Sequence, residues 1–170
     1  MSAFAKGCLC GGCFCGWAVQ SGGMIREIDI PPFWLALALA ASWALGQVWP
    51  MPGLEGFGAA LVVAGVGMMG LAVAGMVRAR TTFVPRRDPA VLVTGGLFRV
   101  SRNPIYLADA MILTGAIVWW GAVLALPLVP VFILWITRRY ILDEEARLRA
   151  AFGAQYEAWA AQVPRWVWRF

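Results

Sequence analysis

Carboxylate, guanidinium and phenol groups are the main side chains in this 170-residue sequence that could do chemistry. The chain has nine Asp and Glu, 14 Lys and Arg and three Tyr residues, but no His. The absence of His excludes His-ligated zinc or haem, Ser-His-Asp and Cys-His catalysis, and proton transfer through an imidazole. All four Cys residues precede residue 16, so the body of the chain offers no thiol nucleophile. Any reaction therefore has to use carboxylates, Arg, Tyr and scattered hydroxyl groups.

The dipeptide Asn103-Pro104 stands at the start of an apolar segment and is flanked by four Arg residues. These are Arg86, Arg87, Arg99 and Arg102. Asn is a good N-cap and Pro is favoured at the first helical position, so the dipeptide predicts the start of a helix. A helix N-terminus also attracts anions. Two interpretations stay open: a pocket for a carboxylate or phosphate, or ordinary basic residues beside a membrane span.

A second group of charged residues lies in residues 138–161, which have helical periodicity. One apolar stripe contains Ile141, Leu148, Phe152 and Trp159. Glu144 and Glu145 border this stripe. Asp143 with Arg147, and Glu145 with Arg149, have the (i, i+4) spacing of ion pairs on a helix. Glu144 has no such partner, so it either reaches interfacial water or binds a cationic or hydroxyl-bearing group, and we favour the second.

Asp109 is the one charged residue in residues 103–137. It lies about 7–8 Å along the helix that Pro104 begins, at 1.5 Å per residue. Carboxylates within a membrane are candidates for a functional role. At this shallow depth, however, we expect Asp109 to be solvated or paired with Arg102.

The composition predicts that the elements carrying these groups lie in a bilayer. Apolar residues make up 61% of the chain and charged residues 14%, against roughly 25% charged in soluble domains. A soluble domain of this length could not bury so much apolar surface. At about 20 residues per span, we predict an all-α bundle of four transmembrane helices in one domain, residues 30–170. The spans are expected at about 32–49, 56–77, 104–120 and 121–137, followed by a cytoplasmic helix at 138–161.

Details of these helices follow from Gly, Trp and Pro. The last two spans form a hairpin that reverses at Trp119-Trp120-Gly121, since Trp favours the headgroup layer and Gly permits a tight turn. We expect Pro127 and Pro130 to bend the second arm of this hairpin. The small residues Gly65, Gly67 and Gly70 are expected to allow close helix packing rather than nucleotide binding.

The basic residues indicate the orientation. From residue 78 onward, every Arg falls between the second and third spans or after the fourth, and none falls in residues 50–55 or 119–121. The positive-inside rule therefore predicts that both termini and the Arg-rich loop lie in the cytoplasm. We expect an integral protein of the bacterial inner membrane. The net charge of +5 suits anionic headgroups, and no soluble basic face is available for nucleic acid. The oligomeric state is not specified by the sequence.

The first 29 residues contain Cys8, Cys10, Cys13 and Cys15. Four close thiols could bind a soft metal, but their spacing is tighter than the paired C-x-x-C of zinc sites. We therefore predict a disordered Cys-rich leader and no metal site. Met24 offers a plausible alternative start for the chain.

Two motifs occur together in the second half of the chain. The first reads Leu92-Val93-Thr94-Gly95-Gly96-Leu97-Phe98-Arg99 and then Arg102-Asn103-Pro104-Ile105-Tyr106-Leu107. The second holds Glu144-Glu145, Phe152-Gly153 with Tyr156, and Val163-Pro164-Arg165-Trp166. Together they resemble a family of small integral-membrane methyltransferases, which includes isoprenylcysteine carboxyl methyltransferases and phospholipid N-methyltransferases. The isoprenylcysteine enzymes usually carry His in place of Asn103, whereas phospholipid-type members carry Asn-Pro-x-Tyr.

The resemblance implies an enzyme that uses S-adenosylmethionine to methylate a lipid or other apolar small molecule, such as a phospholipid amine or an isoprenylcysteine-like carboxylate. Its cofactor pocket would face the cytoplasm. The residues that match the family's cofactor-contacting positions are Gly96, Phe98, Arg102, Asn103, Pro104, Tyr106, Glu144 and Glu145. On the same basis, Arg102, Asn103 and Tyr106 are the expected catalytic residues. Methyl transfer needs alignment and exclusion of water more than a titrating group, which suits a chain without His.

Two other functions are compatible with the same helical architecture. A non-catalytic membrane scaffold or lipid-binding protein would bind anionic vesicles through its Arg residues and would have no affinity for adenosyl ligands. A membrane reductase of related architecture, proposed by analogy alone, would be stabilised by NADPH instead.

Overall fold

The computed structural model describes residues 30–49, 51–52, 54–80 and 91–167. The predictions for the Cys-rich leader and for Arg86 and Arg87 concern residues outside these ranges.

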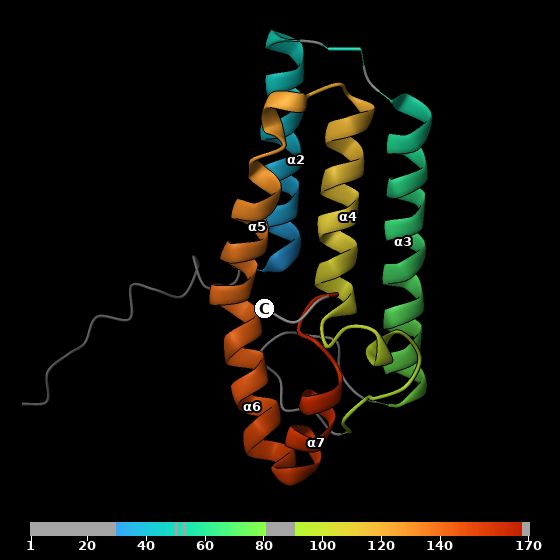
Figure 1. The fold of residues 1–170 in the computed structure, drawn as a ribbon, viewed down its shortest axis with the longest axis vertical. Helices are drawn as coiled ribbons and strands as arrows, with labels where there is room; N and C mark the ends of the chain where they lie inside the picture. The colour runs from blue at the N-terminus through green and yellow to red at the C-terminus, as the bar shows by residue number, and fades with distance from the viewer. Residues whose placement is uncertain (1–29, 50, 53, 81–90, 168–170) are drawn as a thin grey trace, which may run out of the picture.

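Helices make up all the regular structure in the described ranges, which confirms the predicted all-α class. Four of them lie side by side, and consecutive helices run in opposite directions (Figure 1). These are α2 (Pro31–Val48), α3 (Glu55–Arg78), α4 (Pro104–Trp119) and α5 (Leu128–Ile136). Two helices, Glu55–Arg78 and the run Val123–Phe152, are long and apolar enough to cross a membrane. The prediction of four spans stays a prediction, because α4 has only 16 residues.

The helix ends follow from local sequence. Pro31 and Pro104 occupy the first turns of α2 and α4, where a missing N–H costs no hydrogen bond. The chain reverses after α4 as predicted, with Gly121 at φ +63°, a left-handed conformation that glycine adopts without steric cost. Pro127 immediately precedes α5 and Pro130 lies in its first turn, so the two prolines mark the beginning of this helix.

Helix α4 is the centre of the bundle, with α3 on one side and α2 and α5 on the other (Figure 1). Glycines allow α3 and α4 to approach closely: a Cβ on Gly58 would lie 2.7 Å from the carbonyl oxygen of Gly115, and one on Gly65 would lie 2.8 Å from Ile112 Cγ1. The packing role expected of Gly65 is therefore confirmed. The same packing role is wrong for Gly67 and Gly70, because a Cβ on either residue would meet no described atom within 4 Å.

The predicted single helix over residues 138–161 is wrong at its start and in its middle, whereas its predicted end lies within one residue of the end of the last helix. Helix α5 continues through a π-helical turn, η3 (Thr137–Ile141), directly into α6 (Leu142–Phe152). The chain then turns at Gly153, where φ is +47°, and α7 (Ala154–Gln162) follows. A positive φ is accessible to glycine at little cost, so Gly153 ends the helix although the apolar periodicity continues beyond it. As a result, α7 folds back beside α6 at the lower end of the bundle (Figure 1).

The contact between α3 and α4 gives a test of this packing. We expect Gly58→Ala to lower the stability by about 1–3 kcal/mol, because the added methyl group meets backbone atoms that cannot move independently. Gly67→Ala is the matched control and should leave the thermal unfolding midpoint unchanged or slightly higher, since Ala favours helix over Gly by about 1 kcal/mol. Equal midpoints for the two variants in detergent would contradict the close approach of α3 and α4.

Candidate functional site

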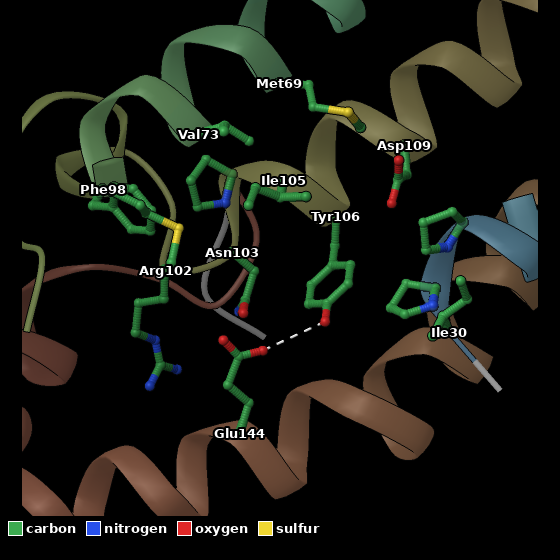
Figure 2. Close-up of a pocket in the computed structure, with 14 residues that line it drawn as sticks. Ile30, Met69, Val73, Phe98, Arg102, Asn103, Ile105, Tyr106, Asp109 and Glu144 are labelled. Atoms are coloured by element: carbon green, nitrogen blue, oxygen red, sulfur yellow. Dashed lines mark hydrogen bonds between the residues drawn. The ribbon is translucent and has the colours of Figure 1, made fainter. Parts of the chain in front are cut away.

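A cavity of about 360 Å³ lies at the lower end of the bundle, and most of the predicted site residues surround it. It is formed by the start of α2, the second half of α3, the first turns of α4 and α6, together with the short 3-10 helix η1 (Gly96–Arg99). Figure 2 shows its walls. The lining residues are Ile30, Pro31, Pro32, Met69, Val73, Met76, Phe98, Arg102, Asn103, Pro104, Ile105, Tyr106, Asp109 and Glu144.

Glu144 and Tyr106 meet across the cavity. The Tyr106 hydroxyl donates a hydrogen bond to Glu144 Oε2 at 3.4 Å, joining α4 to α6 (Figure 2). Glu144 therefore has a hydroxyl-bearing partner, as expected, although that partner belongs to the protein itself. At 3.4 Å the bond lies at the long end of the range for O–H···O. A ligand with a better donor could compete for this carboxylate.

Glu145 faces away from the cavity and is the centre of a charged cluster. It is 5% exposed and accepts two hydrogen bonds from Arg165, at 2.8 Å from Nε and 2.6 Å from Nη2. Arg102 Nη1 lies 3.4 Å from its Oε1. We call Glu145, Arg165 and Arg102 the Glu145 cluster. The hydrogen bonds to the Glu145 carboxylate raise the pKa of Arg165, so this guanidinium keeps its charge.

The predicted ion pair between Glu145 and Arg149 does not form, so this prediction is wrong. Arg149 instead bonds to Glu157 on α7, and both side chains are exposed. Two Arg residues from distant parts of the chain outcompete the local partner because they enclose Glu145 within the protein, where charges are less screened.

Backbone hydrogen bonds reinforce the Glu145 cluster. The segment after α7 runs back to the start of α4, where the Arg102 N–H donates to the Pro164 carbonyl at 2.9 Å. The Ser101 hydroxyl and the Asn103 Nδ2 both donate to the Arg165 carbonyl, each at 3.1 Å. Residues 101–103 and 164–165 are thus fastened together although about 60 positions separate them.

Asn103 occupies the N-cap position of α4 as predicted, but its side chain does not cap the helix. Its amide donates to the Arg165 carbonyl instead, and its backbone N–H donates to the Ser101 hydroxyl. The simple explanation of Asn103-Pro104 as a helix-start dipeptide is therefore incomplete, because Asn103 also connects the loop to the C-terminal segment.

Arg102 is held on one side and unpaired on another. Its Nη1 donates to the Tyr156 hydroxyl at 3.1 Å and approaches Glu145, whereas its Nε is buried without a hydrogen-bond partner among the described residues. Burial raises the pKa of Tyr156, so its hydroxyl stays neutral beside the guanidinium. An unpaired buried N–H is costly, which makes Arg102 the clearest place for an anionic or polar ligand atom.

The remaining predicted residues separate into two groups. Phe98 and Pro104 line the cavity, and the Phe98 carbonyl accepts a hydrogen bond from Trp159 Nε1 at 3.2 Å. Gly96 and Glu145 do not line it. Gly96 has φ +60°, so its contribution lies in the backbone turn that begins η1.

The apolar wall of the cavity and the burial of Asp109 differ from what the sequence motifs predict. One face of α3 supplies Met69, Val73 and Met76 to this wall. Their spacing of four and three residues is typical of one face of a helix, and this pattern could have indicated that the face lines a site. Asp109 is only 4% exposed and lines the cavity. The expectation that it is solvated or paired with Arg102 is wrong, since no such pair occurs and the carboxylate is buried.

A second cavity, of about 340 Å³, lies between α2 and α5. It is lined by Trp34, Leu37, Ala38, Ala41, Leu128, Val131, Phe132 and Trp135. None of these residues is charged, so this cavity offers no acid, base or charged binding group.

Comparison with known proteins gives one finding. A family model described as phospholipid methyltransferase matches residues 54–155, which run from α3 to the first residues of α7. No curated protein and no solved structure matches the chain.

The Glu145 cluster predicts a difference between two Glu→Gln substitutions. Glu145→Gln leaves two guanidinium groups without their anion, and we expect a loss of about 2 kcal/mol in the free energy of unfolding. Glu157→Gln removes the exposed partner of Arg149 and should change stability little. Thermal unfolding of the detergent-purified variants measures both. A Glu145→Gln midpoint equal to that of Glu157→Gln would show that the cluster does not stabilise the fold.

Proposed function

Because the chain belongs to the phospholipid methyltransferase family, we propose that it transfers a methyl group from S-adenosylmethionine to a lipid or other apolar acceptor. The observation that carries this proposal is the form of the cavity at the lower end of the bundle. It has polar groups on one side and an apolar wall on the other, and its volume is in the range of small-molecule sites.

The residues of the polar side fit the cofactor. S-adenosylmethionine, when bound, supplies an electrophilic methyl group together with a carboxylate, an amino group, ribose hydroxyls and an adenine ring. The Arg102 guanidinium, with its unpaired buried Nε, suits the carboxylate. The Glu144 carboxylate can accept hydrogen bonds from the amino group or the hydroxyls, and the Phe98 ring can pack against the adenine. The set of donors and acceptors therefore matches the group.

The other predicted residues take supporting roles in this proposal. Tyr106 and Asn103 line the cavity beside Glu144 and orient what binds there. Glu145 acts through Arg102, so we assign it as a positioning residue rather than a cofactor contact. The apolar residues Met69 and Val73 on α3 exclude water from the site, as displacement at a sulfonium requires.

The membrane location and orientation complete the proposal. Arg78, Arg138, Arg139 and Arg147 lie at or beyond the ends of α3 and α5 that border the cavity. We propose that this end faces the cytoplasm, in line with the positive-inside rule, and that both termini lie on the same side. An acceptor lipid would then reach the site from the bilayer with its head at the interface.

Glu144 gives the test of the proposed function. S-adenosylhomocysteine at a hundred times its dissociation constant should stabilise the detergent-purified protein by about 2.7 kcal/mol, measured by thermal unfolding. Glu144→Gln should remove most of this shift, because the amide lacks the charge and one acceptor oxygen of the carboxylate. Asp143→Asn is the matched control, since Asp143 is an exposed neighbour outside the cavity, and it should keep the full shift.

NADPH separates this function from the alternatives. We expect no stabilisation by NADPH. A shift with NADPH alone would favour a reductase, and no shift with either ligand in folded protein would favour a scaffold or lipid-binding protein.

A further inference from the structure

Asp109 is the charged group of the cavity that the proposed cofactor binding does not use. It lies on α4 three residues beyond Tyr106, so both side chains emerge from the same face of the helix. Its carboxylate points toward the interior of the cavity (Figure 2). Tyr106 bonds to Glu144 of α6 across the same cavity, so carboxylates from two different helices line this space.

The surroundings of Asp109 are apolar. Met69 of α3 lies near it in Figure 2, and the start of α2 contributes further apolar lining residues, Pro31 and Pro32. Asp109 is 4% exposed, and no hydrogen bond or ion pair joins it to another residue within the described part of the chain. Arg102 also belongs to the cavity wall. Its Nη1 is directed to Tyr156 and Glu145 and not to Asp109.

A buried carboxylate without a partner is costly and calls for a cation or hydrogen-bond donor. The polar side of the cavity, with Arg102 and Glu144, is the side proposed for the cofactor. Asp109 lies beside the apolar wall, where the acceptor would bind. A ligand that satisfies this position needs an apolar body and a positively charged head that donates hydrogen bonds.

We propose that Asp109 binds the ammonium head of the acceptor and so selects a lipid amine over a carboxylate or a neutral lipid. A carboxylate acceptor would place two negative charges together in an apolar space, which is strongly unfavourable. This inference rests on the proposed function for the role of the ligand as acceptor, but the binding itself can be measured without cofactor.

The test compares two soluble lipids that share their acyl chains and phosphate and differ in the head group, which carries an ammonium in one and only hydroxyl groups in the other. These are dihexanoylphosphatidylethanolamine and dihexanoylphosphatidylglycerol, titrated into the detergent-purified full chain and followed by tryptophan fluorescence. We expect the ethanolamine lipid to bind at least about tenfold more tightly to the wild-type protein. Asp109→Asn should reduce this preference to within about twofold, whereas the control Asp143→Asn should keep it.

Stability separates a binding role from a structural one. Because Asp109 has no hydrogen-bond or ion-pair partner among the described residues, we expect Asp109→Asn to unfold at the same temperature as the wild-type protein or higher without ligand. A large loss of stability or failure to fold would show that Asp109 supports the structure, and would overturn the proposal. Equal binding of the two lipids by the wild-type protein, or an unchanged preference in Asp109→Asn, would overturn it as well.

S-adenosylhomocysteine distinguishes this failure from failure of the proposed function. Asp109→Asn should keep the full stabilisation by this ligand. If the wild-type protein shows the stabilisation but no lipid preference, the methyltransferase proposal stands and the Asp109 assignment falls. If it shows an Asp109-dependent preference but no stabilisation, the chain binds lipid amines and the proposed cofactor is wrong.

Discussion

The enclosure of one carboxylate, Glu145, between two guanidinium groups is the interaction on which the arrangement of the site depends. The fold brings Arg102 from the start of α4 and Arg165 from the C-terminal segment to the same residue on α6. Burying a charged carboxylate is costly unless its charge is matched and its oxygens are bonded, so the burial of Glu145 favours keeping these three segments together. The adjacent backbone bonds from Arg102 to Pro164 and from Ser101 to Arg165 follow the same geometry.

This constraint explains why the polar residues of the cavity come from separate parts of the chain. Since Glu145 is fixed toward Arg165, its neighbour Glu144 is directed to another side of α6, where it meets Tyr106. Arg102 is held through Nη1, which leaves Nε buried and unpaired. The apolar helices cannot supply such groups within a bilayer without large cost, so the charged residues gather where α5 continues into α6 at one end of the bundle.

Elements whose signals are local could be predicted from the sequence. Pro31 and Pro104 mark helix starts, and Gly121 marks a reversal, because each residue restricts or frees its own backbone. The break at Gly153 escaped prediction because apolar periodicity continues across it. The partner of Glu145 escaped prediction because Arg165 is 20 positions away, and burial rather than spacing decides between it and Arg149. Asp109 was placed by its depth along one helix, whereas its burial depends on α2 and α3, which local sequence does not position.

The most direct test of the central claim is hydrogen–deuterium exchange of the detergent-purified chain with and without S-adenosylhomocysteine. If α6 and the loop before α4 together form one adenosyl site, the ligand will slow exchange in residues 96–106 and in residues 142–148 at the same ligand concentration. Residues 34–48 of α2, on the far side of the bundle from α3, serve as the internal reference and should not change. Unchanged exchange in both segments, or slower exchange in only one of them, would contradict a single site built across the Glu145 cluster.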